Sequence, residues 1–139
     1  HLIQKEVEST PISTNIATKH WDTVHQGMTA VINAPNGTAR ALASKDYVFA
    51  GKSGTSQVYG KSEEDIYKKD AELPKHLRNH ALFIAFAPVE APEIAVVVVA
   101  EHGASGTKAA APIAKKIIDA YMTINNKIPA KENNEVDDD

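Results

Sequence analysis

Two continuous apolar runs stand out in the hydrophobic pattern of the chain. They are Ala81–Ala87 (ALFIAFA) and Ile94–Ala100 (IAVVVVA), each of strand length, and the second is rich in β-branched residues. The turn residues Pro88–Glu93 lie between them and predict a hairpin. Because both runs are apolar on both faces, we expect central strands that helices cover on either side.

Apolar residues at helical spacing predict a helix before these strands. Its apolar stripe consists of Trp21, Val24, Met28, Val31 and Ile32. Thr18 is the expected N-cap, Asp22 suits the first turns, and the turn Pro35–Gly37 ends the helix. We interpret the stripe between Trp21 and Met28 as core rather than as a cofactor site.

A second helix is predicted after the strands. Its expected inner face consists of Ile113, Ile117, Ile118, Tyr121 and Met122. Lys115, Lys116 and Asp119 lie on the opposite face, and Pro112 is tolerable only near the first turn.

The remaining segments complete the predicted architecture. Tyr47–Ala50 is a short apolar strand, and the polar stretch 58–79 is long enough to be a functional flap or disordered, with Glu63–Lys69 favouring a short helix. The order helix, strand, flap, strand, strand, helix predicts an α/β (α+β layered) domain, an antiparallel sheet flanked by helices. We expect residues 1–128 to form this unit and the acidic segment 129–139 to be disordered.

Composition narrows the function classes. The chain has 139 residues and a net charge of −3, with no cluster of basic residues, so we expect no nucleic-acid partner. It has no cysteine, which excludes thiolate chemistry and disulfides. The most apolar region is interrupted by prolines and glutamates and cannot be one membrane-spanning helix. Because the chain starts at His1 and not at Met, we expect that upstream residues are missing.

The stretch FAGKSGTSQ, residues 49–57, concentrates a lysine, hydroxyls and glycines directly after an apolar run. A phosphate loop would need a glycine where Asp46 stands and a helix directly afterwards, and neither is present. A strand at a cleft is the better interpretation. Ser53 and Thr55 point to the same side, Lys52 adds positive potential, and a backbone N–H can face an oxygen that becomes negative.

This stretch resembles the Lys-Ser/Thr-Gly motif of the penicillin-recognising serine enzymes. The surrounding segments that carry the resemblance are Trp21–Met28, Pro35–Ala39, Ala50–Gly60, His80–Pro88 and Glu101–Gly103. Together they are similar to a class B penicillin-binding protein, and the Asn-Gly-Thr-Ala turn and the length of the flap point to the rod-elongation type, penicillin-binding protein 2. The resemblance covers roughly residues 20–124 and implies the C-terminal part of a transpeptidase domain.

The resemblance implies a peptidoglycan D,D-transpeptidase that works through a serine acyl-enzyme and is a β-lactam target. Lys52 and Thr55 would be catalytic, with the N–H of Thr55 in the oxyanion hole. Ser53, Gly54, Thr55 and Ser56 would bind substrate. No cofactor is implied, and no metal site is expected, because the pair His76 and His80 lacks the glutamate of a zinc motif.

The nucleophile is not evident in this chain. In the family the nucleophile is the serine of a Ser-x-x-Lys motif, which precedes the Lys-Ser/Thr-Gly motif in the chain. Ser105-Gly106-Thr107-Lys108 fits Ser-x-x-Lys but follows Lys52. We therefore interpret Ser105 as a helix N-cap or loop residue. Ser13-Thr14-Asn15 fits Ser-x-Asn, the family's motif between the other two. It lies only a short way before Lys52, whereas the family motif lies much farther upstream. We therefore expect both motifs upstream of His1, and the chain by itself to be inactive.

The resemblance also implies partners and a location. The partners are stem peptides, β-lactams, the upstream portion of the same domain, and a glycosyltransferase and scaffold proteins of the elongation complex. The location is the periplasmic face of the bacterial inner membrane, with a single N-terminal helix as anchor. Two alternatives remain open: a non-catalytic β-lactam sensor or cell-wall binding module, and a serine β-lactamase or carboxypeptidase.

Overall fold

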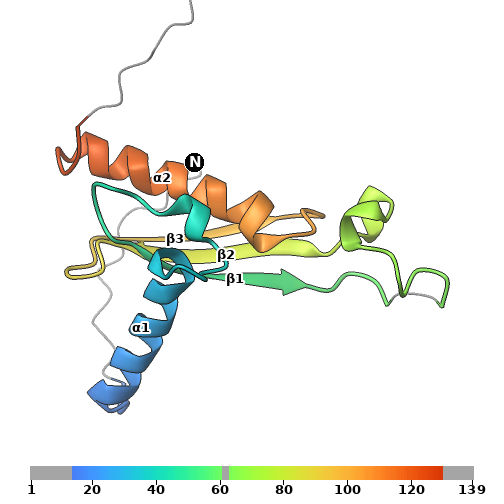
Figure 1. Cartoon of the computed structure of the whole chain (residues 1–139), viewed down its shortest axis with the longest axis horizontal. Helices are drawn as coiled ribbons and strands as arrows, with labels where there is room; N and C mark the ends of the chain where they lie inside the picture. Colours follow the sequence, from blue (N-terminus) through green and yellow to red (C-terminus); the bar gives the residue numbers. More distant parts are fainter. Residues whose placement is uncertain (1–13, 61–62, 130–139) are drawn as a thin grey trace, which may run out of the picture.

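The computed structural model describes residues 14–60 and 63–129. Its main elements are α1 (Thr18–Asn33), β1 (Ala50–Ser56), β2 (His80–Ala87), β3 (Ile94–Ala100) and α2 (Ala111–Ile124). The strands form one antiparallel sheet in the order β1-β2-β3. The predicted element order and the antiparallel sheet flanked by helices are confirmed (Figure 1).

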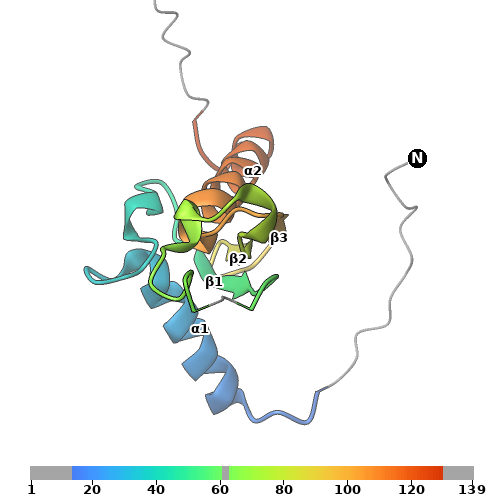
Figure 2. The same cartoon turned by 90° about the vertical axis from the view of Figure 1, so that its right-hand side faces the viewer.

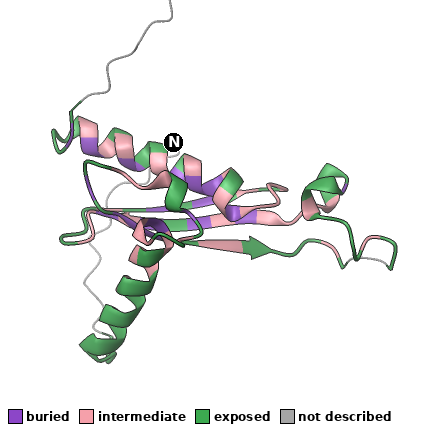
Figure 3. Ribbon diagram, viewed as in Figure 1, coloured by how far each residue is buried: buried purple, intermediate pink, exposed green. Residues whose placement is uncertain are grey.

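The sheet lies between two helices. Helix α2 runs over one face and contacts β2 and β3, whereas α1 approaches from the other side and contacts β1 (Figures 1 and 2). Alternate residues of β2 and β3 point toward α2 and are buried. They are Ala81, Phe83, Ala85, Ala87, Val96 and Val98. The core therefore sits between the sheet and α2, where Figure 3 shows most of the buried positions.

The inner face of α2 differs from the predicted one. Its buried residues are Ala111, Ala114, Ile118 and Met122. Ile118 and Met122 confirm part of the predicted face, but Ile113 and Ile117 are 45% and 44% exposed, so the prediction was wrong for these two residues. Small alanines let the helix backbone approach the sheet closely, and this packing outweighs the larger side chains of the isoleucines. Pro112 lies in the first turn, as expected.

Helix α1 differs from its prediction at its start. Thr18 is the first helical residue, and Ala17 occupies the N-cap position without a side-chain hydrogen bond. The first turn contains no acidic residue, so Asp22 lies beyond it. Trp21 is 41% exposed, and Ile32 is the buried residue of this helix, so Trp21 does not belong to the core of the described part of the chain.

The strands extend and modify the sequence prediction. The hairpin of β2 and β3 is confirmed, but β1 begins at Ala50 and runs through Ser56 rather than covering Tyr47–Ala50. Within the described residues β1 and β3 are the two edge strands of the sheet. In β3, Val97 and Val99 are 69% and 57% exposed. The expectation that both faces are covered is therefore wrong for β3.

The segment between β1 and β2 extends beyond the end of the sheet (Figure 1). Residues 63–67 form turns rather than the predicted helix over Glu63–Lys69, and short 3-10 helices follow at Asp70–Glu72 and Lys75–Leu77. Leu73, between these two, is only 1% exposed and fixes this part of the segment to the domain. The predicted acidic tail lies outside the described residues except for Pro129.

Candidate active site

Strand β1 carries the Lys-Ser-Gly-Thr stretch at one edge of the sheet of described residues. Lys52, Thr55 and Ser56 are exposed, and Ser53 and Gly54 are half-buried. No member of the predicted set is buried in the core. All of them are therefore accessible to a molecule that lies along this edge.

Two hydrogen bonds fix which backbone groups of β1 face the open edge. The carbonyl of Val48 accepts the N–H of Val89 at 3.0 Å on the side of β2. The carbonyl of the next residue, Phe49, accepts Asn33 Nδ2 at 2.9 Å, on the side of α1. Because backbone groups alternate along a strand, the N–H groups of Ser53 and Thr55 face the open edge together with the carbonyl of Phe49.

The pairing register fixes the faces of the side chains. Ser53 and Thr55 pair with Phe83 and Ala81, which are both buried under α2, so both hydroxyls project from that face. Lys52 projects from the opposite face, opposite the half-exposed Ile84. The Lys52 Nζ lies at the open edge of β1, where it donates to the carbonyl of Ser53 at 2.6 Å. Hydroxyls and positive charge thus lie along one short length of the strand.

This arrangement is suited to binding a carboxylate next to a reacting carbonyl. Hydroxyl donors and an ammonium group form the strong, charge-assisted hydrogen bonds that a carboxylate accepts. A backbone N–H at the open edge can donate to an oxygen that gains negative charge, as in an oxyanion hole. The geometry of β1 is therefore compatible with acyl transfer.

Gly106, at the start of the π-helical turn Gly106–Ala110, packs closely against β1 and β2. A Cβ built on Gly106 would lie 2.5 Å from the carbonyl oxygen of Leu82 and 2.8 Å from that of Gly54. Sequence reasoning missed this contact, because a glycine in a loop after a strand gives no signal of what lies beside it.

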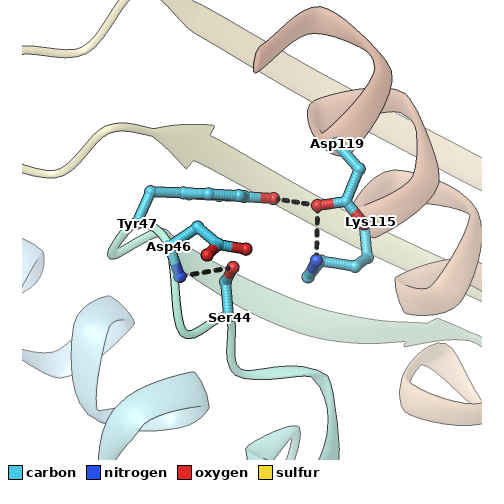
Figure 4. Close-up of polar contacts among 5 residues, drawn as sticks. All are labelled: Ser44, Asp46, Tyr47, Lys115 and Asp119. Carbon is cyan, nitrogen blue, oxygen red and sulfur yellow. Dashed lines mark hydrogen bonds and ion pairs between the residues drawn. The ribbon is translucent and has the colours of Figure 1, made fainter. Parts of the chain in front are cut away.

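The chain that leads into β1 is anchored to α2 through Tyr47. The Tyr47 hydroxyl donates to Asp119 Oδ1 at 2.8 Å, and Lys115 forms an ion pair with the same oxygen (Figure 4). The Lys115 ammonium also lies 5.3 Å from the centroid of the Tyr47 ring. Lys115 and Asp119, predicted on a polar outer face, are half-buried and hold β1 in place.

Burial of Tyr47, together with its hydrogen bond to Asp119, raises the pKa of the phenol above its ordinary value. The folded protein therefore retains this proton at a pH where the unfolded chain loses it, above about pH 10. The contribution of Tyr47 to stability is complete below that pH and declines as the pH rises.

Replacement of Tyr47 by phenylalanine removes this hydrogen bond and leaves Asp119 paired with Lys115. We expect the free energy of unfolding at pH 8 to fall by about 1.5–3 kcal/mol, as for one hydrogen bond to a charged group. Between pH 9 and 11 the variant should lose less stability than the wild type. Calorimetry of the intact protein at several pH values measures both effects, and equal pH slopes in the two proteins would contradict the assignment.

The other candidates from the sequence are Ser105, the pattern of residues 13–15, and the pair His76 and His80. Ser105 occupies the N-cap position of the π-helical turn, with its Oγ 3.3 Å from Thr107 Oγ1, which agrees with its interpretation as a cap or loop residue. Ser13 of the second pattern lies outside the described residues. His80 contacts His102 and not His76, and the described residues contain no group of three or more metal-ligating side chains.

A cavity of about 520 Å³ lies between α1 and the turn after β2. Its lining residues are Asp22, His25, Gln26, Thr29, Ala30, Asn33, Ala34 and Val89. It is separate from the exposed length of β1, so the candidate site is an open strand edge and not this cavity.

Comparison with known proteins shows the family of the chain. The family model described as penicillin binding protein transpeptidase domain matches residues 2–119. The chain belongs to this family. Peptidoglycan D,D-transpeptidase MrdA of Haemophilus influenzae is 42% identical over 113 residues, which are 81% of this chain and 17% of MrdA. The chain thus spans about a sixth of the length of that transpeptidase.

Solved structures of the penicillin-binding protein family superpose on the chain. PBP2 of Pseudomonas aeruginosa in complex with WCK 5153 matches with a TM-score of 0.64 and 38% identity, over 86% of this chain and 24% of that one. PBP2 of Helicobacter pylori in complex with MreC gives 0.63 and 26%, over 82% and 20%. Penicillin-binding protein A of Mycobacterium tuberculosis, a penicillin G acyl-enzyme, gives 0.54 and 28%, over 77% and 21%.

The recognised resemblance to penicillin-binding protein 2 is thereby confirmed. Helices long and apolar enough to span a bilayer are absent from residues 14–60 and 63–129.

Proposed function

We propose that this chain is the C-terminal part of a peptidoglycan D,D-transpeptidase of the rod-elongation type. One observation carries the proposal: in a member of this family, the Lys52–Ser56 stretch of β1 is an accessible edge of the sheet that the described residues form. The N–H groups of Ser53 and Thr55 face outward there. A serine upstream of this chain would attack the carbonyl between the two D-Ala residues, which breaks that peptide bond, releases the terminal D-Ala and leaves the serine acylated. An amine on a stem peptide of a neighbouring glycan strand would then attack the ester, take the acyl group and restore the serine hydroxyl.

In this proposal each residue of the strand has a separate role. The hydroxyls of Ser53 and Thr55 hold the terminal carboxylate, and Lys52 supplies positive charge and assists proton transfer. The N–H of Thr55 donates to the oxyanion, and removal of one such donor lowers the rate by about 10²–10³ in hydrolases. Gly54 and Ser56 alternate with these donors, and their small size lets the donor peptide approach the strand. β-Lactams, which present a carboxylate beside a strained amide, acylate the same serine.

The proposal extends to partners and location. The stem peptide is the acyl donor and acceptor, and the upstream portion of the domain supplies the nucleophile. A glycosyltransferase and scaffold proteins of the elongation machinery are proposed partners, the latter supported by the PBP2–MreC complex of Helicobacter pylori. The protein would act at the periplasmic face of the inner membrane.

A fluorescent penicillin tests the proposed function in the intact protein that carries this chain. We expect covalent labelling, and with a stem-peptide donor and an amine acceptor we expect cross-linked product by mass spectrometry. Labelling without cross-linking would favour a sensor, and hydrolysis alone would favour a β-lactamase or carboxypeptidase. Absence of any covalent label would contradict the proposal.

Ser105→Ala is a matched control in the same assay. Because Ser105 lies at the cap of the π-helical turn, we expect its variant to be labelled at the wild-type rate. Loss of labelling in this variant would instead locate the nucleophile at Ser105.

A further inference from the structure

The turn after β3 contains two non-glycine residues with left-handed backbone. His102 has a φ of 55° and Ala104 a φ of 64°. L-residues rarely adopt this conformation, because Cβ approaches the following carbonyl oxygen. Such a conformation persists only where the surroundings impose it, and it is found most often near functional sites. The contacts that impose this turn therefore need an explanation.

The hydrogen bonds that hold the turn come from the start of β2. The N–H of His102 donates to Nδ1 of His80 at 3.0 Å, so this nitrogen of His80 carries no proton. Nδ1 of His102 donates to the carbonyl of Arg78 at 3.1 Å. The N–H of Ala104 donates to the carbonyl of Asn79 at 3.0 Å. The conformation of the turn is thus set by three consecutive residues.

The same three residues also hold the end of the candidate site strand. Oδ1 of Asn79 accepts the N–H of Val58 at 3.3 Å, two residues after the end of β1 at Ser56. Within the sheet, His80 pairs directly with Ser56. Asn79 therefore bonds through its side chain to the exit of β1 and through its carbonyl to the turn.

The turn also contacts β1 through the packing of Gly106 against the strand. Ala104 is followed by Ser105 and Gly106, and a Cβ on Gly106 would lie only 3.1 Å from Cβ of Ser53. A shift of the turn would move Gly106 against Ser53 and Gly54. The site strand is thus held at its exit by Asn79 and along its length by the residues that the turn positions.

We propose that Arg78, Asn79, His80, His102 and Ala104 form a clasp that positions the Lys52–Ser56 strand for acyl transfer. This inference rests on the proposed function. The hydrogen bonds of the clasp run between backbone groups, Asn79 and the two imidazoles, so its members are positioning residues rather than catalytic ones. Nδ1 of His80 is the side-chain acceptor that the turn's backbone N–H of His102 uses.

A matched pair of variants at His80 separates positioning from general stability. His80→Asn keeps an acceptor at the δ position, where Nδ1 lies, whereas His80→Gln moves the acceptor one bond outward. In the intact protein, we expect His80→Gln to lower the rate constant of acylation by fluorescent penicillin about tenfold, the equivalent of one lost hydrogen bond. The dissociation constant of the noncovalent complex should change less. His80→Asn should stay within about threefold of the wild type, because a retained acceptor preserves most of that energy.

Hydrogen exchange without penicillin gives a readout that does not depend on the proposed function. The amides of Gly54 and Ser56, which face β2, and of Val58, which donates to Asn79, should exchange faster in His80→Gln than in the wild type or in His80→Asn, while the amides of α2 serve as an internal control. If His80→Gln does not fold, Asn79→Ala removes only the bond to Val58 and should change both measurements in the same direction.

Each outcome decides the inference. The clasp is refuted if His80→Asn is impaired as much as His80→Gln, or if neither variant changes exchange at Gly54, Ser56 and Val58. Faster exchange with unchanged acylation would also overturn it, because the clasp would then have no effect on the reaction. If the wild type takes up no penicillin, the proposed function fails, and the exchange data still decide whether the clasp holds the strand.

Discussion

Simultaneous replacement of Lys52, Ser53 and Thr55 by alanine is expected to slow acylation of the intact protein by penicillin about a thousandfold. Each side chain is assigned a hydrogen bond or charge contact to the carboxylate, and each such bond to a charged group contributes about 1.5–3 kcal/mol. None of the three is buried in the core, so the melting temperature should stay close to that of the wild type. Stopped-flow or gel-based labelling measures the rate.

The single variants and a remote control complete this experiment. Because groups that act together on one ligand are not additive, the three single losses should not sum to the combined loss. Lys116→Ala removes the same charge from an exposed position on α2 and should leave the labelling rate unchanged. Wild-type labelling of the triple variant would remove the assignment of this strand as the active-site edge.

Gly106→Ala is expected to lower the acylation rate about a hundredfold, since a misplacement of about 1 Å can cost that much in a catalytic site. The described glycines do not have positive φ, so the effect is one of space and not of backbone conformation. The new methyl group would meet the carbonyl oxygens of Leu82 and Gly54. Both belong to sheet backbone and cannot rotate away, so the turn or β1 must shift.

Gly27→Ala is the matched control for this variant. Gly27 lies within α1, and a Cβ there would meet no atom within 4 Å, so the same change should leave acylation as it is. An acylation rate for Gly106→Ala equal to that of Gly27→Ala would show that the contact between the turn and β1 does not affect acylation.

The sequence predicted those parts of the fold that depend on local pattern. The apolar runs became β2 and β3, and the positions of both helices were correct. The start of α1 was wrong because Thr18 was assigned a cap that Ala17 occupies without a side-chain bond. The inner face of α2 was correct at Ile118 and Met122 and wrong at Ile113 and Ile117, because alanines rather than these isoleucines pack against the sheet.

The candidate site was predictable only in part for a similar reason. Lys52, Ser53 and Thr55 are neighbours in sequence, so their shared strand edge follows from alternation and from the family motif. The contacts that hold the strand join residues far apart, such as Tyr47 with Asp119 and His80 with His102. A single sequence carries no signal for such pairs, because each member is unremarkable in its own segment.

The uncovered edge of β3 has a consequence for laboratory work. Val97 and Val99 present β-branched side chains to water, and the backbone along this strand has no partner on its outer side among the described residues. Exposed strands of this kind recruit further strands and promote aggregation. Purification of these 139 residues alone would thus favour insoluble assemblies, and a charged substitution at Val97 or Val99 should improve refolding yields.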